Sequence, residues 1–150
     1  MRHQKVLVLG GSGFVGRHLI NRLIRDGRRV TVPVRRRDKA KHLILHATID
    51  VVEANVHDDA VLAQLVTGQD AVINLVGILQ GSAADFERAH AALTRRTVAA
   101  CEAAGVARCQ HMSALGASET GPSMYQRSKG AAEAAVRASR LDWTIYQPSV

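Results

Sequence analysis

The hydrophobic pattern of this 150-residue chain switches repeatedly between two periodicities, and few folds accommodate such a switch. The short apolar run at residues 5–10, bounded by glycine, predicts a buried strand, and further strands are predicted at residues 30–34, 49–53, 71–75, 109–113 and 143–147. Apolar residues three or four apart predict helices at residues 14–25, 42–45, 60–66, 86–104 and 125–139. Alternating strands and helices indicate right-handed crossovers, and therefore an α/β fold in which helices cover both faces of a parallel sheet.

The composition agrees with one three-layer α/β/α domain. Hydrophobic residues make up 47% of the chain but aromatic residues only 3%, which is typical of an aliphatic sheet covered by helices. No apolar run approaches the roughly 20 residues that a membrane span needs, so we expect a soluble, cytoplasmic protein. Pro33 conflicts with the second strand because it has no N–H to donate, and we expect a bulge or an early strand end there.

A glycine-rich turn joins the first strand to the first helix. Glycines at positions 10, 13 and 16 have the spacing G-x-x-G-x-x-G. Such a turn lets the backbone approach a pyrophosphate, while free N–H groups at the helix start face the anion. Simple turn chemistry is the alternative, but the context favours a dinucleotide site on a Rossmann-like, doubly wound sheet with strand order 3-2-1-4-5-6. The predicted cofactor-binding residues of this turn are Gly10, Gly11, Ser12, Gly13, Phe14, Val15 and Gly16.

The end of the second strand indicates which dinucleotide binds. A carboxylate about 20 residues beyond the glycines would hold the ribose 2′-hydroxyl of NAD. Val34 stands near that place and Arg35, Arg36 and Arg37 follow. Guanidinium groups suit a 2′-phosphate, so NADP(H) is favoured over NAD(H), which stays possible. Arg35 is the first candidate and Arg36 the second, although Arg36 or Arg37 could simply face water.

The positive charge is local. The net charge is +7, and residues 1–41 alone hold twelve Lys and Arg against two Asp and Glu. Phe14 is the one aromatic residue in that segment, so the platforms on which bases would stack are missing and nucleic acid is not the expected partner. A compact anionic ligand explains the charge better, with a solvated surface as the alternative. His42 and His46 are four residues apart without a nearby carboxylate or Cys, so no metal site is predicted.

Three residues near the last predicted crossover could carry chemistry. Tyr125 and Lys129 are four residues apart at the start of a helix, so both lie on one helix face. Ser113 ends the strand before it. A hydroxyl there can hold a substrate carbonyl, while a phenol whose pKa is lowered by a nearby ammonium transfers a proton as hydride moves. Tyr and Lys at this spacing also occur as plain surface neighbours.

These motifs together resemble the short-chain dehydrogenases/reductases, in their extended or atypical branch, over the whole chain. The stretches VTVPVRRR, DAVINLVGIL, HMSALGA and YQRSKGAAE are similar to a group often labelled NAD-dependent epimerase/dehydratase, which includes an NADPH-binding accessory subunit of mitochondrial complex I and its bacterial relatives. The resemblance implies further cofactor contacts near the adenine, the nicotinamide ribose and the nicotinamide face. These are, respectively, Asn55 and Val56, then Val76 and Gly77 with Tyr125 and Lys129, then Pro148 and Ser149.

Three positions depart from the family pattern. Asn55 stands where Asp is usual, His90 where many active members have a helix Asn, and Gln147 where Arg commonly precedes Pro-Ser. The resemblance therefore implies the cofactor more firmly than the reaction. One hypothesis is an NADP(H)-dependent oxidoreductase acting on a carbonyl or alcohol through Ser113, Tyr125 and Lys129. The other is a non-catalytic NADPH-binding subunit or assembly factor of a respiratory complex.

The resemblance also carries expectations about organisation and partners. We expect residues 1–150 to be the NAD(P)-binding domain, with a C-terminal substrate-binding part missing after the sixth strand, because no closing helix follows Pro148. An unidentified small molecule is the expected substrate. A homodimer through helices 86–104 and 125–139 is a further expectation. A partner in a respiratory complex would place the protein at the periphery of the inner membrane.

Overall fold

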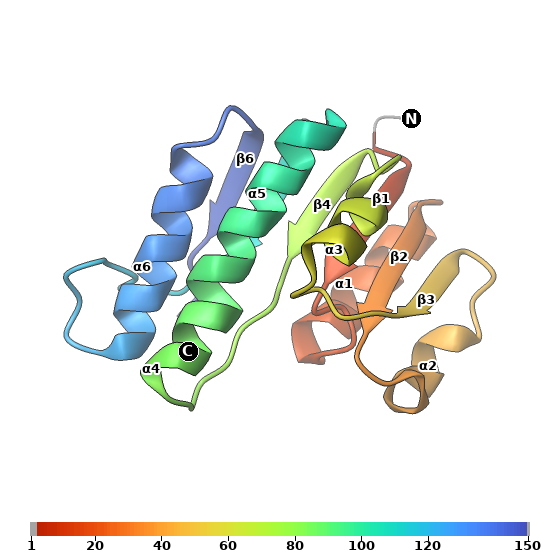
Figure 1. Cartoon of the computed structure of the whole chain (residues 1–150). Coiled ribbons are helices and arrows are strands. Elements are labelled where there is room, and N and C mark those ends of the chain that lie inside the picture. The colour runs from red at the N-terminus through yellow and green to blue at the C-terminus, as the bar shows by residue number, and fades with distance from the viewer. Residues whose placement is uncertain (1–2, 150) are drawn as a thin grey trace.

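The computed structural model describes residues 3–149, which form a six-stranded parallel sheet with the strand order β3-β2-β1-β4-β5-β6 (Figure 1). The strands are β1 (Lys5–Leu9), β2 (Arg29–Val34), β3 (Ile49–Glu53), β4 (Ala71–Asn74), β5 (Arg108–Met112) and β6 (Asp142–Tyr146). All strands run parallel, but the order in which the chain adds them to the sheet reverses between β1 and β4. This position is the switch point at which open α/β sheets bind ligands. The predicted doubly wound order is confirmed.

Helices follow the strands as the periodicity predicts. They are α1 (Phe14–Arg25), α2 (Lys41–Ile44), α3 (Asp59–Val66), α4 (Ala83–Phe86), α5 (Leu93–Ala104) and α6 (Met124–Arg137). A short 3-10 turn (Arg37–Ala40) precedes α2. A π-helical turn (Glu87–Ala92), called the π turn below, joins α4 to α5 so that residues 83–104 form one continuous rod. No helix within residues 3–149 is long and apolar enough to cross a membrane.

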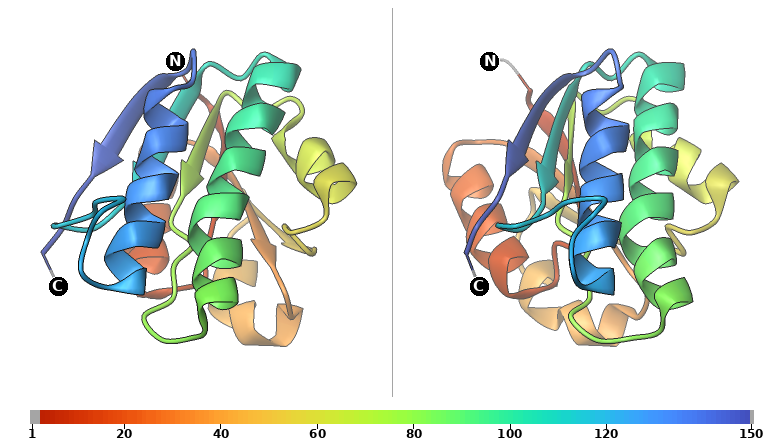
Figure 2. Two further views of the ribbon diagram at one scale, coloured as in Figure 1. Left: turned by 60° about the vertical axis from the view of Figure 1, so that its left-hand side comes forward. Right: turned by 90° about the vertical axis from the view of Figure 1, so that its left-hand side faces the viewer.

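Two separate cores lie on the two faces of the sheet. In a strand, successive side chains point to opposite faces, so Leu7 and Leu9 pack on one side of β1 while Val6 and Val8 pack on the other. The leucine side is covered by α3, α5 and α6, and the valine side by α1 and α2. Figure 2 shows α5 and α6 side by side on one face, with α1 behind the sheet. This arrangement is the expected three-layer α/β/α fold.

Pro33 does not interrupt β2, so the predicted bulge or early strand end is wrong. Pro33 pairs in regular register with Val52, and β2 continues to Val34. The N–H of Arg29 donates to the Gln4 carbonyl on the β1 side, and odd-numbered residues of β2 share that direction. The pairing of β1 with β2 ends at Thr31. By the same alternation Pro33 faces β1, and the pairing with β1 stops because Pro33 has no N–H to donate, while the pairing with β3 carries the strand on to Val34.

The long helix begins three residues earlier than predicted, at Ala83 instead of Phe86. Ser82 caps it, because its hydroxyl accepts from the Asp85 N–H at 3.2 Å while the Asp85 carboxylate accepts from the Ser82 N–H at 2.8 Å. This reciprocal pair is a capping box. Ser123 and Gln126 form the same device at the start of α6. That cap fixes the helix turn that carries Tyr125.

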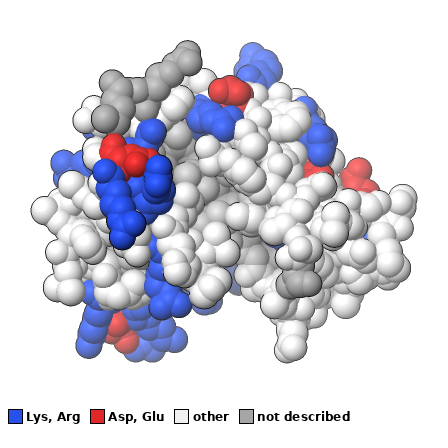
Figure 3. All heavy atoms as spheres, turned by 180° about the vertical axis from the view of Figure 1, so that it is seen from behind, with Lys and Arg blue, Asp and Glu red and all other residues white. Residues whose placement is uncertain are grey.

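The basic residues do not form one continuous surface. Figure 3 shows the molecule from behind, with Lys and Arg in separate groups that lie mainly on the side of α1 and β2, and with acidic side chains among them. Arg29 pairs with Asp50 at 2.9 Å, and Arg22 with Asp26 at 3.4 Å. These acidic partners neutralise part of the positive charge, and the remaining basic side chains on this face form separate groups and no continuous basic groove.

Candidate dinucleotide-binding site

The glycine turn lies directly under the exit of β4. Gly10 has a left-handed φ of +76°, and a Cβ added there would lie 3.0 Å from the Leu75 carbonyl carbon and the Val76 nitrogen. Gly16 packs even more tightly, since its Cβ would lie 2.3 Å from the Gly11 oxygen. Both positions therefore accept only glycine without backbone movement. The glycines at 10 and 16 bring the turn, β4 and α1 into one close assembly.

The start of α1 has no side chain that satisfies its amides. Gly13 is the N-cap, makes no side-chain cap bond, and is followed by a first turn without acidic residues. The first N–H groups of a helix have no partner within the helix and carry the positive end of its dipole. A phosphate group is the natural partner for such a helix start. The local structure is therefore that of an anion cradle.

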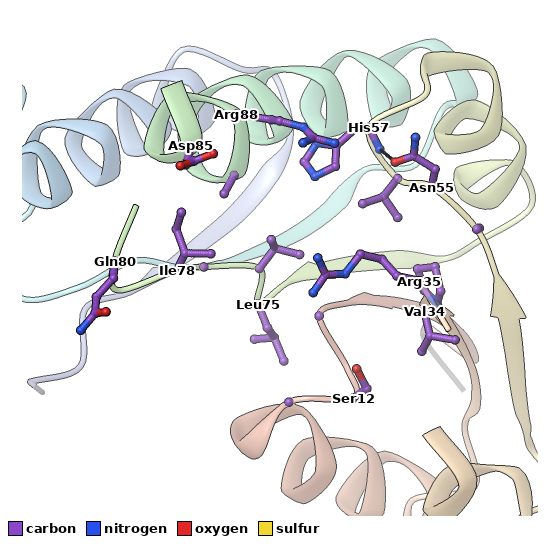
Figure 4. Close-up of a pocket in the computed structure, with 18 residues that line it drawn as sticks. Ser12, Val34, Arg35, Asn55, His57, Leu75, Ile78, Gln80, Asp85 and Arg88 are labelled. Carbon is purple, nitrogen blue, oxygen red and sulfur yellow. Dashed lines mark hydrogen bonds between the residues drawn. The ribbon is translucent and has the colours of Figure 1, made fainter. Parts of the chain in front are cut away.

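A cavity of about 590 Å³ opens above this turn at the carboxyl ends of the strands (Figure 4). Its walls come from the segments after β1, β2, β3 and β4 and from the first turns of the rod at 83–104. The predicted cofactor-binding residues on its wall are Gly10, Ser12, Gly13, Arg35, Asn55, Val56, Val76 and Gly77.

The other predicted site residues do not line this cavity. Gly11 and Gly16 lie beneath the turn, where they pack against one another. Phe14 and Val15 are 73% and 47% exposed on the first turn of α1. The remaining predicted residues off the cavity wall are Arg36, Ser113, Tyr125, Lys129, Pro148 and Ser149.

The structure separates the three consecutive arginines. Arg36 is bound to the carboxylate of Asp38 through two hydrogen bonds of 3.2 and 2.9 Å. Arg37 is absent from the cavity wall, and its backbone N–H donates to Glu53. Arg35 lines the cavity, its side chain extends into it in Figure 4, and no side-chain partner is found for it within residues 3–149. Of the three, Arg35 alone can meet a ligand in this cavity without breaking an ion pair.

Sequence reasoning missed two basic groups on the opposite wall. Arg88, from the π turn, and His57, from the segment after β3, lie beside one another across the cavity from Arg35 (Figure 4). Partial burial lowers the pKa of His57, and the charges of Arg88, Arg96 and Arg35 lower it further. The only sequence signal for Arg88 was its helical spacing from Asp85, which also lines the cavity.

Lys129 lies behind the cavity wall. It is only 4% exposed, and its Nζ donates to the Met112 carbonyl at 3.0 Å. Burial lowers the pKa of Lys129 to about 8, although the carboxylate of Glu133 opposes this shift. A Cβ on Gly77 would lie 3.4 Å from the Nζ. The ammonium group therefore borders the cavity wall at its one glycine after β4.

Tyr125 does not have the low pKa expected of a phenol beside an ammonium. Burial raises its pKa, with no lowering contribution from Lys129. The ring packs edge-on against Phe86 and His90, with centroids 6.2 and 5.5 Å away. Lys129 directs its Nζ to the Met112 carbonyl instead, and the rings of Phe86 and His90 pack against the Tyr125 ring.

Ser113 was predicted to be the last residue of the fifth strand, but β5 ends at Met112 and Ser113 follows it directly, buried beside Glu133 of α6. Burial alone would raise the pKa of the Glu133 carboxyl, but the nearby Ser113 hydroxyl, the Gln147 amide and the Arg137 guanidinium together lower it. Gln147 donates to Glu133 at 2.7 Å. The position that departs from the family Arg is thus occupied by an amide that ties the end of β6 to α6.

The strand order, the glycine turn at the switch point and the cavity above it define a Rossmann-type dinucleotide-binding domain. The chain belongs to a family described as NAD(P)H-binding, which matches residues 10–150.

Similar proteins support the same class. A ceramide reductase from Caulobacter vibrioides is 34% identical over 144 residues, and subunit 9 of the mitochondrial NADH dehydrogenase [ubiquinone] 1 alpha subcomplex from Arabidopsis thaliana is 33% identical over 148. Each match covers 95% of this chain but only 45% and 37% of the relative. A solved protein from Bacillus halodurans, assigned to the NAD-dependent epimerases/dehydratases, superposes with a TM-score of 0.86 at 25% identity, covering 97% of this chain and 70% of that one. The resemblance to the atypical short-chain dehydrogenases/reductases is confirmed.

Proposed function

We propose that this cavity binds NADP(H) in preference to NAD(H). The observation that carries the proposal is Arg35, which extends into the cavity at the end of β2 and has no partner within residues 3–149. Val34 stands where a carboxylate would hold a ribose hydroxyl and repel a phosphate. A guanidinium group forms strong, charge-assisted bonds to phosphate. A 2′-phosphate is therefore attracted at this end of the cavity and meets no fixed negative charge at Val34.

The cavity wall supports an assignment of the rest of the cofactor. The pyrophosphate lies over Gly10 and Gly13 at the start of α1. Asn55 and Val56 border the adenine. The nicotinamide ribose lies along Val76 and Gly77. The family resemblance suggests Pro148 and Ser149, which do not line the cavity, for the nicotinamide face. Arg88 faces Arg35 across the adenosine end and adds a second guanidinium group for the 2′-phosphate.

We further propose that the domain serves hydride transfer between NADP(H) and a carbonyl or alcohol, as the similarity to a reductase suggests. When bound, NADPH supplies the hydride for the carbonyl carbon. Tyr125 gives its phenol proton to the carbonyl oxygen, and its raised pKa keeps that proton in place at neutral pH. Ser113 orients the same oxygen. Lys129, whose pKa of about 8 leaves it mostly charged at pH 7, holds the ribose.

A second function is favoured by a different observation. The chain is also 33% identical to subunit 9 of the NADH dehydrogenase alpha subcomplex, and the phenol of Tyr125 lacks the activation expected of a catalytic acid or base. In this alternative NADPH is a structural ligand of a subunit or assembly factor of a respiratory complex. The cavity and its cofactor preference are the same in both cases.

Fluorescence titration of the chain with NADPH and NADH tests the cofactor proposal. We expect tighter binding of NADPH, and we expect Arg35→Ala to weaken NADPH binding about 10- to 100-fold while NADH binding hardly changes, since a hydrogen bond to a charged group contributes about 1.5–3 kcal/mol. Arg37→Ala is the matched control, because Arg37 is a neighbour in sequence but not on the cavity wall. Tighter binding of NADH, or equal effects of the two substitutions, would contradict the proposal.

Turnover separates the two functions. NADPH oxidation is measured with simple ketones and aldehydes as candidate substrates, in the wild type and in Tyr125→Phe. Oxidation that is lost in Tyr125→Phe, with NADPH affinity retained, supports the enzyme. Tight NADPH binding without turnover in either protein supports the non-catalytic subunit.

A further inference from the structure

His90 lies at the centre of the π turn, between the exit of β4 and the start of α6. It is 1% exposed. Its Nε2 accepts a hydrogen bond from the backbone N–H of Ile78 at 2.9 Å. Its Nδ1 lies 2.8 Å from the hydroxyl oxygen of Ser128. One buried ring therefore bridges the cavity wall and the helix that carries Tyr125.

The partners of the ring fix its protonation. The Ile78 N–H can only donate, so Nε2 must be without a proton. The Ser128 hydroxyl donates its single hydrogen to the Tyr125 carbonyl at 2.9 Å, so it must accept from Nδ1. Every donor and acceptor is satisfied only when His90 is neutral with its proton on Nδ1. Neither ring nitrogen is then available to pass a proton to another group.

His90 lies against the segment after β4, which forms part of the cavity wall, and against the Tyr125 ring. Ile78 follows Val76 and Gly77 on the wall. A Cβ on Gly77 would lie 3.5 Å from the His90 Nε2 and 3.4 Å from the Lys129 Nζ. The Tyr125 ring packs edge-on against the imidazole at 5.5 Å. The imidazole thus touches the backbone beside the nicotinamide ribose and the ring of the proposed proton donor.

We propose that His90 is a positioning residue which, as the neutral Nδ1–H tautomer, holds the segment after β4 against the first turn of α6 and so aligns the cofactor wall with Tyr125. The role in cofactor alignment rests on the proposed binding of NADP(H), whereas the tautomer is a property of the unliganded chain. His90 acts through Ile78 and Ser128 and not by contact with the reacting atoms.

The surroundings keep His90 neutral. Lys129 of α6 faces it, Tyr125 packs against its ring, and His111 of β5 is close enough for the two histidines to interact. Burial, followed by the charge of Lys129, lowers the pKa of His90 to about 4. Protonation would place a hydrogen on Nε2 opposite the Ile78 N–H and break that bond. We therefore expect the bridge to persist through neutral pH and to fail as the pH approaches 4.

Nitrogen NMR of the unliganded, ¹⁵N-labelled protein tests the tautomer directly. We expect a scalar coupling across the hydrogen bond between the Ile78 amide nitrogen and the His90 Nε2, a proton on Nδ1, and no titration of this ring between pH 5.5 and 8. A proton on Nε2, or titration near the ordinary pKa of about 6.5, would overturn the inference. This result does not depend on whether NADPH binds.

Three substitutions test the role in cofactor alignment. In His90→Gln the side-chain oxygen can still accept from Ile78, in His90→Asn the shorter amide reaches only toward Ser128, and in His90→Phe neither bond remains. We expect NADPH affinity within about threefold of wild type in His90→Gln and about tenfold weaker in the other two, because a buried N–H is left without a partner. His42→Gln, at an exposed position of α2, is the control.

The outcomes are separable. If wild type binds NADPH and the Gln and Asn variants bind it equally well, the positioning role fails. If wild type does not bind NADPH, the proposed function fails while the NMR result still decides the tautomer. If His90→Phe does not fold, the contrast between Gln and Asn carries the test.

Discussion

Replacing Gly10 with Ala tests the close approach of the glycine turn to β4, on which the cavity depends. The substitution has two costs. The left-handed φ of +76° is unfavourable for any residue with a Cβ, by about 1 kcal/mol. The added methyl would also lie 3.0 Å from backbone atoms of Leu75 and Val76, which cannot rotate away. Overpacking of this kind costs about 1–3 kcal/mol.

Gly27→Ala separates these two costs. Gly27 has the same φ of +76°, but a Cβ there would meet no atom within 4 Å. It therefore carries the conformational cost without the contact. We expect Gly27→Ala to lower the free energy of unfolding by about 1 kcal/mol and Gly10→Ala to lower it by about 2–4 kcal/mol.

Urea unfolding and NADPH titration measure the two effects on the same proteins. We expect Gly27→Ala to bind NADPH as wild type does, since its turn lies outside the cavity wall. Gly10→Ala should bind NADPH at least tenfold more weakly, because the added methyl group pushes Val76 and the glycine turn apart. Equal losses of stability in the two variants, with equal affinity for NADPH, would refute the close-approach argument.

Three further perturbations have defined outcomes. Ser123→Ala removes the cap of α6 and should lower the free energy of unfolding by about 1 kcal/mol in urea melts, without changing the slope of the transition. Burial lowers the pKa of His90 and of His111 to about 4, so the unfolded chain binds more protons than the folded chain below pH 6.5. The free energy of unfolding should therefore fall by a few kcal/mol from pH 6.5 toward pH 4, and a flat profile across that range would contradict this. Burial raises the pKa of Cys101 to about 12 and of Cys109 to about 11, so neither thiol should react with a thiol reagent at pH 8 until urea unfolds the chain.

The strand order was predictable because strands alternate with helices along the chain, which is typical of a doubly wound parallel sheet. The error at Pro33 shows the limit of this reasoning. A sequence shows that a residue lacks an N–H, but not which neighbouring strand that N–H would have faced. Here it faces β1, whose pairing with β2 stops at Thr31, while the pairing with β3 is intact and the strand continues to Val34. Which neighbour a missing donor affects is a tertiary property.

The floor of the cavity was predictable and its far wall was not. Gly10 and Gly13 follow a strand and begin a helix, so their place in the turn at the floor of the cavity follows from the local sequence. Arg88 lies on the π turn and His57 in the segment after β3, so only the folded structure brings them to one wall of the cavity. Nothing in the spacing of residues 83–104 distinguishes a π turn from a regular α-helix. The pKa of Tyr125 was predicted to be lowered, but burial raises it. That burial could not be predicted from the sequence because it arises where Phe86 and His90, of residues 83–104, pack against the Tyr125 ring.

Gly77 lies where the cavity wall meets two buried polar side chains, Lys129 and His90. The space that its side chain would occupy lies between the Lys129 Nζ and the His90 Nε2, at 3.4 and 3.5 Å. A Cβ there would make ordinary van der Waals contact with both atoms, but a side chain larger than alanine would have to displace the ammonium that donates to the Met112 carbonyl or the imidazole that accepts from Ile78. Both groups are buried, so movement of either breaks a buried hydrogen bond. A large side chain at this position would therefore disturb both the cavity and α6, because only the absence of a side chain at Gly77 lets the cavity wall lie this close to Lys129.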